Sequence, residues 1–205
     1  KNNIGNLCAM ENIHIHIDLI AGLPFEDLTS FRESFNRAFS LNADMLQLGF
    51  LKLLHGAQMR EQKEKYPCDF SKKPPYEVNF TPWISKENLI SLHFTENALD
   101  RFVGSGRFPR TNKLIFEIQK RNPFDTLTEL GMFTGCESCS LNEYVSKIYS
   151  FFGRDKGALR DALISDVATS VKSATLPNCL NVADRRLKEF KKHLESDDNT
   201  RRPKG

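Results

Sequence analysis

Two short apolar runs, separated by one segment of helical periodicity, are the feature that most constrains the fold of this chain. The first run covers residues 13–24 (IHIHIDLIAGLP) and the second covers residues 45–56 (MLQLGFLKLLHG). Each run contains a turn-forming glycine near its end, which is typical of the buried strands of a parallel sheet. Apolar residues recur between them at steps of three and four, at Leu28, Phe31, Phe35, Ala38 and Phe39. The pattern predicts a βαβ unit in which one helix covers the sheet.

The rest of the chain predicts a change of class, from α/β to all-α. Four prolines between residues 67 and 84 are expected to exclude regular structure and to leave an ordered connector or a lid. Helices are expected over 85–195, because Ser85, Asn122 and Ser140 each stand at a cap position before an apolar-periodic run. We expect these helices, including one at 182–194, to form a small bundle. The charged residues 196–205 are expected to form a disordered tail.

Composition excludes several classes of function. A formal charge of +3 on 205 residues, with acidic and basic residues interleaved, argues against a nucleic-acid partner. No apolar run reaches the roughly 18 residues that a membrane span needs, and no signal peptide is visible, so a cytoplasmic protein without a membrane partner is expected. An odd count of five cysteines favours reduced thiols over a disulfide framework.

Several segments, in order, resemble one enzyme family. They are 16–26 (HIDLIAGLPFE), 31–35 (FRESF), 46–54 (LQLGFLKLL), 75–78 (PYEV) and 105–108 (SGRF). This series is similar to the last part of radical SAM enzymes. The nearest likeness is to the subgroup with an N-terminal cobalamin-binding domain and a C-terminal helical domain of unknown function. The oxygen-independent coproporphyrinogen oxidases are a more distant likeness.

The resemblance implies a fold and a cofactor site. Residues 1–66 would be the last two βα units of a partial TIM-type barrel, and 85–195 a helical C-terminal domain. The adenine of SAM would lie against Ile20 and Gly22 after the first strand, and against Leu51, Lys52 and Leu53 after the second. Two positions differ from the family pattern, because Phe25 replaces a usual glycine and Ala57 follows Gly56 in place of threonine. The turns there are expected to differ in shape.

The chemistry of the family needs three cysteines spaced CxxxCxxC to hold a [4Fe–4S] cluster, and this chain has no such spacing. Cys8, Cys68 and Cys179 stand alone, and only Cys136 and Cys139 form a CxxC pair. That pair is either half of a metal or redox site or a helix–helix loop with reduced thiols. The chain alone is therefore expected to be inactive, with no metal of its own.

Strand alternation nominates two catalytic candidates, His16 and Asp18. If the isoleucines of the first run face the covering helix, these two side chains point to the lumen of a complete barrel. There they could orient a substrate or move a proton. The alternative is a His–Asp pair that satisfies its own buried hydrogen bonds.

Five residues of the connector and its flanks are weaker candidates for substrate contact: His55, Tyr76, Glu77, Trp83 and His93. Each could equally pack, cap a helix or lie in a solvated turn.

Two functional hypotheses of different class follow. The first is the C-terminal part of a radical SAM enzyme, which carries part of the SAM-adenine wall and a helical domain over a small-molecule or cofactor substrate. Its partner would be the upstream portion of the same protein, with SAM, the cluster and possibly cobalamin held there. The second is a cluster-less binding or assembly module. In either case the open edge of the first strand is expected to favour self-association.

Overall fold

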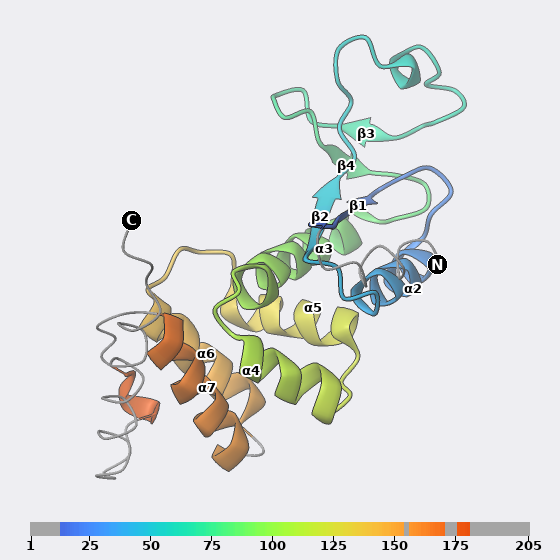
Figure 1. Ribbon diagram of the computed structural model, residues 1–205. Helices are drawn as coiled ribbons and strands as arrows, with labels where there is room; N and C mark the ends of the chain where they lie inside the picture. Colours follow the sequence, from blue (N-terminus) through green and yellow to red (C-terminus); the bar gives the residue numbers. More distant parts are fainter. Residues whose placement is uncertain (1–12, 154–155, 171–175, 181–205) are drawn as a thin grey trace, which may run out of the picture. The chain divides into compact units, whose positions relative to one another are not determined.

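The computed structural model describes residues 13–153, 156–170 and 176–180 (Figure 1). The helix expected at 182–194, the tail expected at 196–205 and Cys8 lie outside these residues. The described chain is mixed α/β, as predicted, and it forms two compact units. Unit 1 comprises residues 1–104 and 122–136, and unit 2 comprises 105–121 and 137–205. None of the helices in the described ranges has the length and apolar content that crossing a membrane requires.

The predicted βαβ unit is present in unit 1. Strands β1 (His16–Ala21) and β2 (Met45–Phe50) pair in parallel, from His16 opposite Met45 to Ala21 opposite Phe50. Helix α2 (Leu28–Phe39) joins them. The prediction of two parallel strands separated by one helix is therefore confirmed, whereas the partial TIM-type barrel stays a prediction.

Helix α2 begins after an aspartate cap. Asp27 is the N-cap, and its carboxylate accepts a hydrogen bond from the Ser30 N–H at 2.8 Å. Phe31, Phe35 and Ala38 form the buried stripe that the periodicity predicts.

The connector contains more regular structure than its prolines suggest. A 3₁₀ turn, η1 (Gln58–Arg60), precedes it, and within it β3 (Asp69–Phe70) pairs antiparallel with β4 (Val78–Phe80). The expectation that prolines exclude regular structure throughout 67–84 is wrong. All four prolines lie outside the paired residues, where no ladder N–H is needed.

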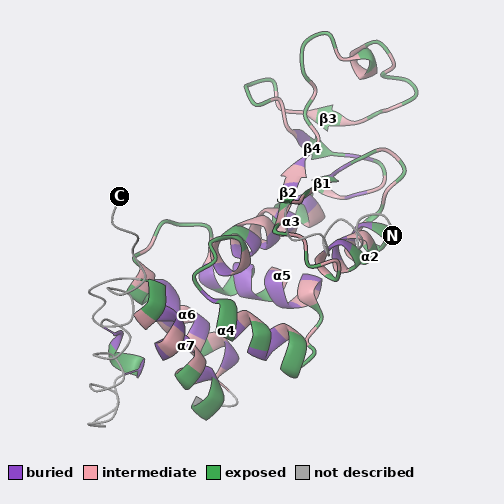
Figure 2. Cartoon of the chain, viewed as in Figure 1, coloured by how far each residue is buried: buried purple, intermediate pink, exposed green. Residues whose placement is uncertain are grey.

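Two helices complete the core of unit 1. Helix α3 (Lys86–Ala98) continues into a π-helical segment, η2 (Leu99–Gly104), and packs closely on α5 (Pro123–Thr134). Ser85 and Asn122 cap α3 and α5 as predicted. The buried faces of both helices are drawn in purple in Figure 2. The core residues here include Leu89, Leu92, Leu99, Phe102, Leu127 and Leu130.

Unit 2 is helical. It contains α4 (Pro109–Asn112), the π-helical η3 (Lys113–Ile118), α6 (Leu141–Phe152), α7 (Lys156–Ser170) and the 3₁₀ turn η4 (Asn178–Leu180). Ser140 caps α6 by accepting from the Glu143 N–H, as predicted.

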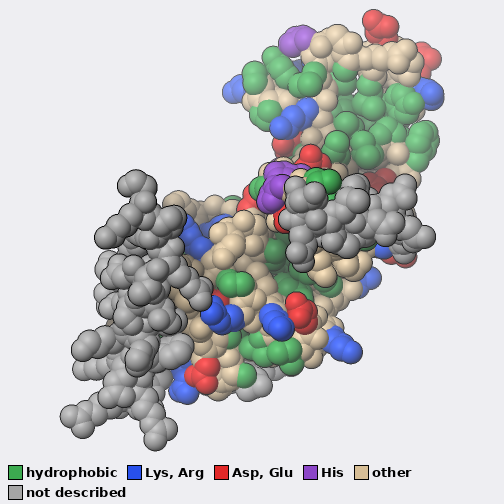
Figure 3. Space-filling view, viewed as in Figure 1, with side chains coloured by type: hydrophobic (Ala, Val, Ile, Leu, Met, Phe, Trp, Pro, Cys, Tyr) green, Lys and Arg blue, Asp and Glu red, His purple; other side chains and the backbone are tan. Residues whose placement is uncertain are grey.

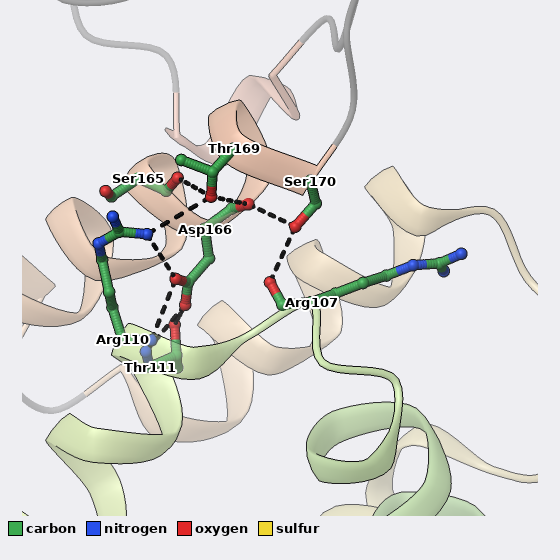
Figure 4. Close-up of polar contacts among 7 residues, drawn as sticks. All are labelled: Arg107, Arg110, Thr111, Ser165, Asp166, Thr169 and Ser170. Carbon is green, nitrogen blue, oxygen red and sulfur yellow. Dashed lines mark hydrogen bonds and ion pairs between the residues drawn. The ribbon is translucent and has the colours of Figure 1, made fainter. Parts of the chain in front are cut away.

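A buried carboxylate ties α7 to the start of α4 (Figure 4). Asp166 is fully buried, and it accepts hydrogen bonds from the backbone N–H groups of Arg110 at 3.1 Å and Thr111 at 2.8 Å. The Thr111 hydroxyl donates to it at 2.7 Å. These donors are otherwise the orphan groups of a helix N-terminus, so Asp166 acts as a cap supplied from a distant helix.

The compact units group the chain differently from the domains expected at 1–66, 67–84 and 85–195. Helices α3 and α5 belong with the strands, because β2 and β4 contact α3, β2 also contacts the η2 segment, and α5 packs on α3. Residues 105–121 belong with α6 and α7.

Candidate functional site at the strand ends

The chain turns sharply after β1, at one of the positions expected to contact adenine. Gly22 is buried with a φ of +85°, in the left-handed region that favours glycine. A Cβ there would stand 2.8 Å from Cγ1 of Val78. The connector itself therefore closes against Gly22 on this side, which gives the glycine a packing role within the chain.

The backbone after β2 is largely engaged by the connector. The Leu51 N–H donates to the Ala21 carbonyl, and the Leu51 carbonyl accepts from the Val78 N–H, each at 2.9 Å. The Leu53 N–H donates to the Tyr76 carbonyl at 2.9 Å, and the Leu53 carbonyl accepts from Nη2 of Arg60 at 2.6 Å. After β1 ends, residues 76–78 therefore take over its position as the hydrogen-bonding neighbour of the residues that follow β2.

Lys52 differs from its two neighbours. It forms an isolated bridge with Glu77, so its own N–H and C=O point to the opposite edge of the strand. Within the described part of the chain these two backbone groups have no hydrogen-bond partner, and the residue is exposed. Lys52 therefore presents one donor and one acceptor side by side.

The face of β1 that carries the catalytic candidates is open. His16, Asp18 and Ile20 are exposed, with Ile20 at 44% of its full exposure, whereas Ile15, Ile17 and Leu19 are half-buried. The alternation of side chains along the strand is as predicted. Within the described chain no hydrogen bond joins His16 to Asp18, so the alternative of a self-satisfied buried pair has no support here; the His16 ring instead meets His14, with centroids 4.8 Å apart.

A second group of polar side chains was not anticipated as a group. Nε2 of His93 lies 2.9 Å from Oε1 of Glu77, and Nδ1 of His93 lies 3.3 Å from Oε2 of Glu96. The ring of Phe50 stacks on the imidazole with centroids 3.7 Å apart. Glu77 and His93 were named separately as candidates, and only the packing of the connector on α3 brings them together.

The surroundings of His93 raise its pKa above the ordinary 6.5. The hydrogen bond with Glu96 raises the pKa most, burial lowers it, and the charges of Glu77 and Glu96 raise it further. Glu77 makes the shorter contact although Glu96 has the larger effect on the pKa. Both carboxylates raise the pKa of His93.

Aromatic side chains surround the loop after β1. Phe25 has a φ of +66°, which is unusual for a residue with a side chain, and it stands where the resembling family has glycine. Its ring lies 4.7 Å from Trp83 and 6.2 Å from Tyr66, centroid to centroid. The rings of Tyr66 and Trp83 thus contact a strained loop residue that remains largely exposed. Figure 3 shows hydrophobic side chains spread over the part of unit 1 that carries β3 and β4.

The remaining candidates lie around a second turn. Nε2 of His55 lies 3.2 Å from the Tyr76 hydroxyl, and the Arg60 guanidinium lies 5.8 Å from the centre of the Tyr76 ring. Arg60 also donates to the carbonyl of Leu54. His55 and Tyr76 therefore have local partners that hold the residues after β2.

Comparison with known protein families finds a family model that matches most of the chain. Residues 64–203 match the family model described as a protein of unknown function, DUF4080. The chain belongs to the DUF4080 family. No curated protein matches it.

The DUF4080 match begins after β2 and includes the connector and the helices from α3 to α7. Glu77, His93 and Glu96 are therefore inside the family region. The open face of β1 and the Gly22 turn precede it.

In the part of this DUF4080 chain that the structure describes, Cys68, Cys136, Cys139 and Cys179 form no disulfide. Cys136 is exposed, and its thiol donates to the His93 carbonyl at 3.9 Å. Burial is the largest cause that raises the pKa of the Cys136 thiol. Cys179 donates to the Ser146 hydroxyl at 3.4 Å. Across the described ranges, no set of three or more His, Cys, Asp or Glu side chains has an arrangement suited to a metal ion.

Proposed function

We propose that this DUF4080 chain is the C-terminal part of a radical SAM enzyme, in which it supplies part of the SAM-adenine wall and a helical domain that covers the substrate. The observation that carries the proposal is the parallel β1–α2–β2 unit with an open face that bears His16, Asp18 and Ile20. A two-stranded parallel sheet exposed on one face is a part of a larger α/β sheet or barrel, because parallel sheets are normally covered on both faces.

The backbone of Lys52 supports an adenine contact. The edge of adenine offers an amino donor next to a ring-nitrogen acceptor, which complements one backbone C=O and one N–H. Among Leu51, Lys52 and Leu53, Lys52 has its pair unused, and it lies at the carboxyl end of β2, where barrels of this type bind ligands. Ile20, exposed at the end of β1, offers an apolar surface for the ring.

When bound, SAM and a [4Fe–4S] cluster would supply the radical chemistry, and the cluster ligands would come from the upstream portion. His16 and Asp18 would line the floor of the chamber and orient the substrate or move a proton. The cysteine spacing of this chain holds no cluster, so the chain alone is inactive under this proposal. Cobalamin, if used, would bind upstream as well.

Strand pairing offers the route by which the upstream portion would join. The edge of β1 away from β2 pairs with no strand in the part of the chain that is described. Such an edge accepts another strand through its backbone groups. In the isolated chain the same edge would favour self-association.

A second candidate is a cluster-less binding or assembly module. It is favoured by the connector, which fills the side of Gly22 and satisfies Leu51 and Leu53 without any ligand. The two proposals differ in what the gene encodes before Lys1: a CxxxCxxC loop with further βα units supports the enzyme, and its absence supports the module.

The decisive experiment compares two substitutions at Lys52 in the protein that includes the upstream region, after anaerobic cluster reconstitution. Lys52→Pro removes the backbone N–H, and Lys52→Ala removes only the side chain. We expect the Pro variant to lose SAM affinity by about tenfold, the value of one hydrogen bond to a ligand, while the Ala variant keeps it. Equal affinity of both variants, with circular dichroism showing an unchanged fold, would contradict the adenine contact. For the isolated chain we expect weak or no SAM binding, and micromolar affinity in calorimetry would argue against the need for the cluster.

A further inference from the structure

The side chain of His93 joins the connector to α3. Glu77 contributes a carboxylate from the connector, and Glu96 contributes one from the next turn of α3, each to a different ring nitrogen. Phe50 from β2 stacks on one face of the imidazole. His93 is about half-buried, with its side chain at 40% of full exposure, so solvent protons still reach it.

Both contacts are satisfied in one protonation state only. A neutral imidazole donates from one nitrogen and accepts at the other, whereas a protonated one donates from both. Carboxylates accept and do not donate. The neutral ring therefore loses one of the two contacts and places a nitrogen lone pair against a carboxylate.

Three further titratable or charged groups lie around Glu96 and the His93 backbone, and none of them is among the causes that shift the pKa of His93. Asp100 of η2 lies near Glu96, and burial followed by the charge of Glu96 raises the pKa of Asp100. The thiol of Cys136 contacts the His93 carbonyl, and Arg101 partly offsets the influence of Glu96 on that thiol. Glu77 and Glu96 remain the groups that face the ring nitrogens directly.

The backbone around Glu77 shows what the contact holds in place. Tyr76 and Val78, its neighbours, bond to Leu53 and Leu51, and the Val78 side chain closes against Gly22. Release of Glu77 would therefore remove an ion pair to α3 from a three-residue segment that covers the end of β1, and would leave this segment held by its backbone hydrogen bonds and by the packing of β4 on α3.

We propose that His93 is a proton-controlled clasp: the imidazolium holds Glu77 and keeps residues 76–78 closed over the carboxyl ends of β1 and β2, and loss of its proton to solvent frees this segment. The clasp rests on the contacts of these residues alone. It stands or falls independently of the radical SAM proposal, although in such an enzyme it would control the cover of the adenine wall.

The direction of the effect follows from linkage. Because the closed state raises the pKa of His93 above 6.5, the clasp is fully effective below pH 6.5 and is lost as pH rises through the higher pKa of the closed state. Each unit by which the closed-state pKa exceeds the open-state pKa changes the closing equilibrium tenfold.

Two measurements on the whole chain test the clasp. The first is the NMR titration of the His93 ring in the wild type and in Glu77→Gln, which keeps the shape of the side chain and removes its charge. The second is amide hydrogen exchange of residues 76–80 between pH 6 and pH 9, corrected for the intrinsic rate. The matched control is His14→Gln, which changes an exposed histidine two residues before β1.

We expect a His93 pKa above 6.5, a lower value in Glu77→Gln, and a loss of protection at residues 76–80 above that pKa. The protection factor of residues 76–80 should fall by tenfold for each unit by which the His93 pKa of the wild type exceeds that of Glu77→Gln. The His14→Gln variant should behave as the wild type. A His93 pKa at or below 6.5, or protection of 76–80 that does not change with pH, would overturn the clasp. Because Glu77→Gln keeps every backbone contact, the test does not depend on whether a His93 variant folds.

Discussion

Cγ1 of Val78 lies 2.8 Å from the point where a Cβ on Gly22 would stand, so two residues 56 positions apart in the numbering share one van der Waals space. This contact fixes the connector against the end of β1. Glycine is required at position 22 for two reasons, the positive φ and the close approach of Val78. Substitutions can measure the two contributions separately.

Gly22→Ala should destabilise the chain by roughly 2–5 kcal/mol. About 1–2 kcal/mol comes from the left-handed backbone, and roughly 1–3 kcal/mol from overpacking against Val78. Gly56→Ala is the matched control, because Gly56 has a φ of +79° but nothing within 4 Å, so it should cost only the backbone share. Urea denaturation measures both, and equal losses would show that Val78 moves aside freely. The double variant Gly22→Ala, Val78→Ala should lose less stability than the sum of the losses in the two single variants.

Gly131→Ala should separate α3 from α5. A Cβ at Gly131 would stand 2.0 Å from the backbone carbonyl oxygen of Phe94, which cannot turn away as a side chain can. We expect a loss of about 3 kcal/mol or more in the free energy of unfolding, at the upper end of overpacking. Gly157→Ala, in α7 with nothing within 4 Å, should instead stabilise by up to about 1 kcal/mol through helix propensity. If both substitutions change stability in the same direction, the close helix contact is not as described.

Asp166→Ala should destabilise unit 2 by roughly 3 kcal/mol, because it leaves two backbone N–H groups and the Thr111 hydroxyl without their buried acceptor. Asp166→Asn keeps one acceptor oxygen and should fall between. Asp161→Ala, on the exposed side of the same helix, should stay within about 0.5 kcal/mol of the wild type. Chemical denaturation followed by far-UV circular dichroism measures the free energy of unfolding of the three variants. An Asp166→Ala variant as stable as the wild type would contradict the role of Asp166 as a cap.

Arg32→Ala should lower the thermal midpoint more than Arg37→Ala does. The Arg32 guanidinium binds both carboxylate oxygens of Asp125, with Nε to Oδ1 at 2.7 Å, whereas Arg37 reaches Glu33 only at 4.0 Å. The hydrogen bond from Arg32 holds the pKa of Asp125 below its ordinary 3.8. A depressed carboxylate pKa stabilises above the unfolded value and is lost as pH falls through the folded one. The difference between wild type and Arg32→Ala should thus shrink below pH 3.8 and with added salt; a difference that stays constant would mean that the pair contributes through packing.

The strands, the helix between them and three helix caps could be predicted because local patterns determine them. The alternation of Ile15, His16 and Ile17 sets which side chains face α2, and Ser85, Asn122 and Ser140 accept from the N–H three residues on. These signals lie within a few residues of the feature they specify.

The contacts that build the site could not be predicted in the same way. Glu77 meets His93 across 16 positions, and Val78 meets Gly22 across 56, so nothing adjacent in the sequence records either pair. The π-helical segments at 99–104 and 113–118 have no local signal in the hydrophobic pattern. The number of prolines does not predict the pairing of β3 with β4, because the positions of the prolines outside the paired residues decide whether the ladder forms.

The route of the chain through its two units has a consequence for synthesis on the ribosome. After residue 104 the chain enters unit 2, returns to unit 1 at 122–136, and then enters unit 2 again. The start of α4 therefore emerges 55 residues before the carboxylate that caps it, and α3 emerges before the α5 surface it packs on. All residues of unit 1 have therefore been translated once residue 136 is made, whereas the first segment of unit 2 is made before unit 1 is complete and must wait for the residues after 136.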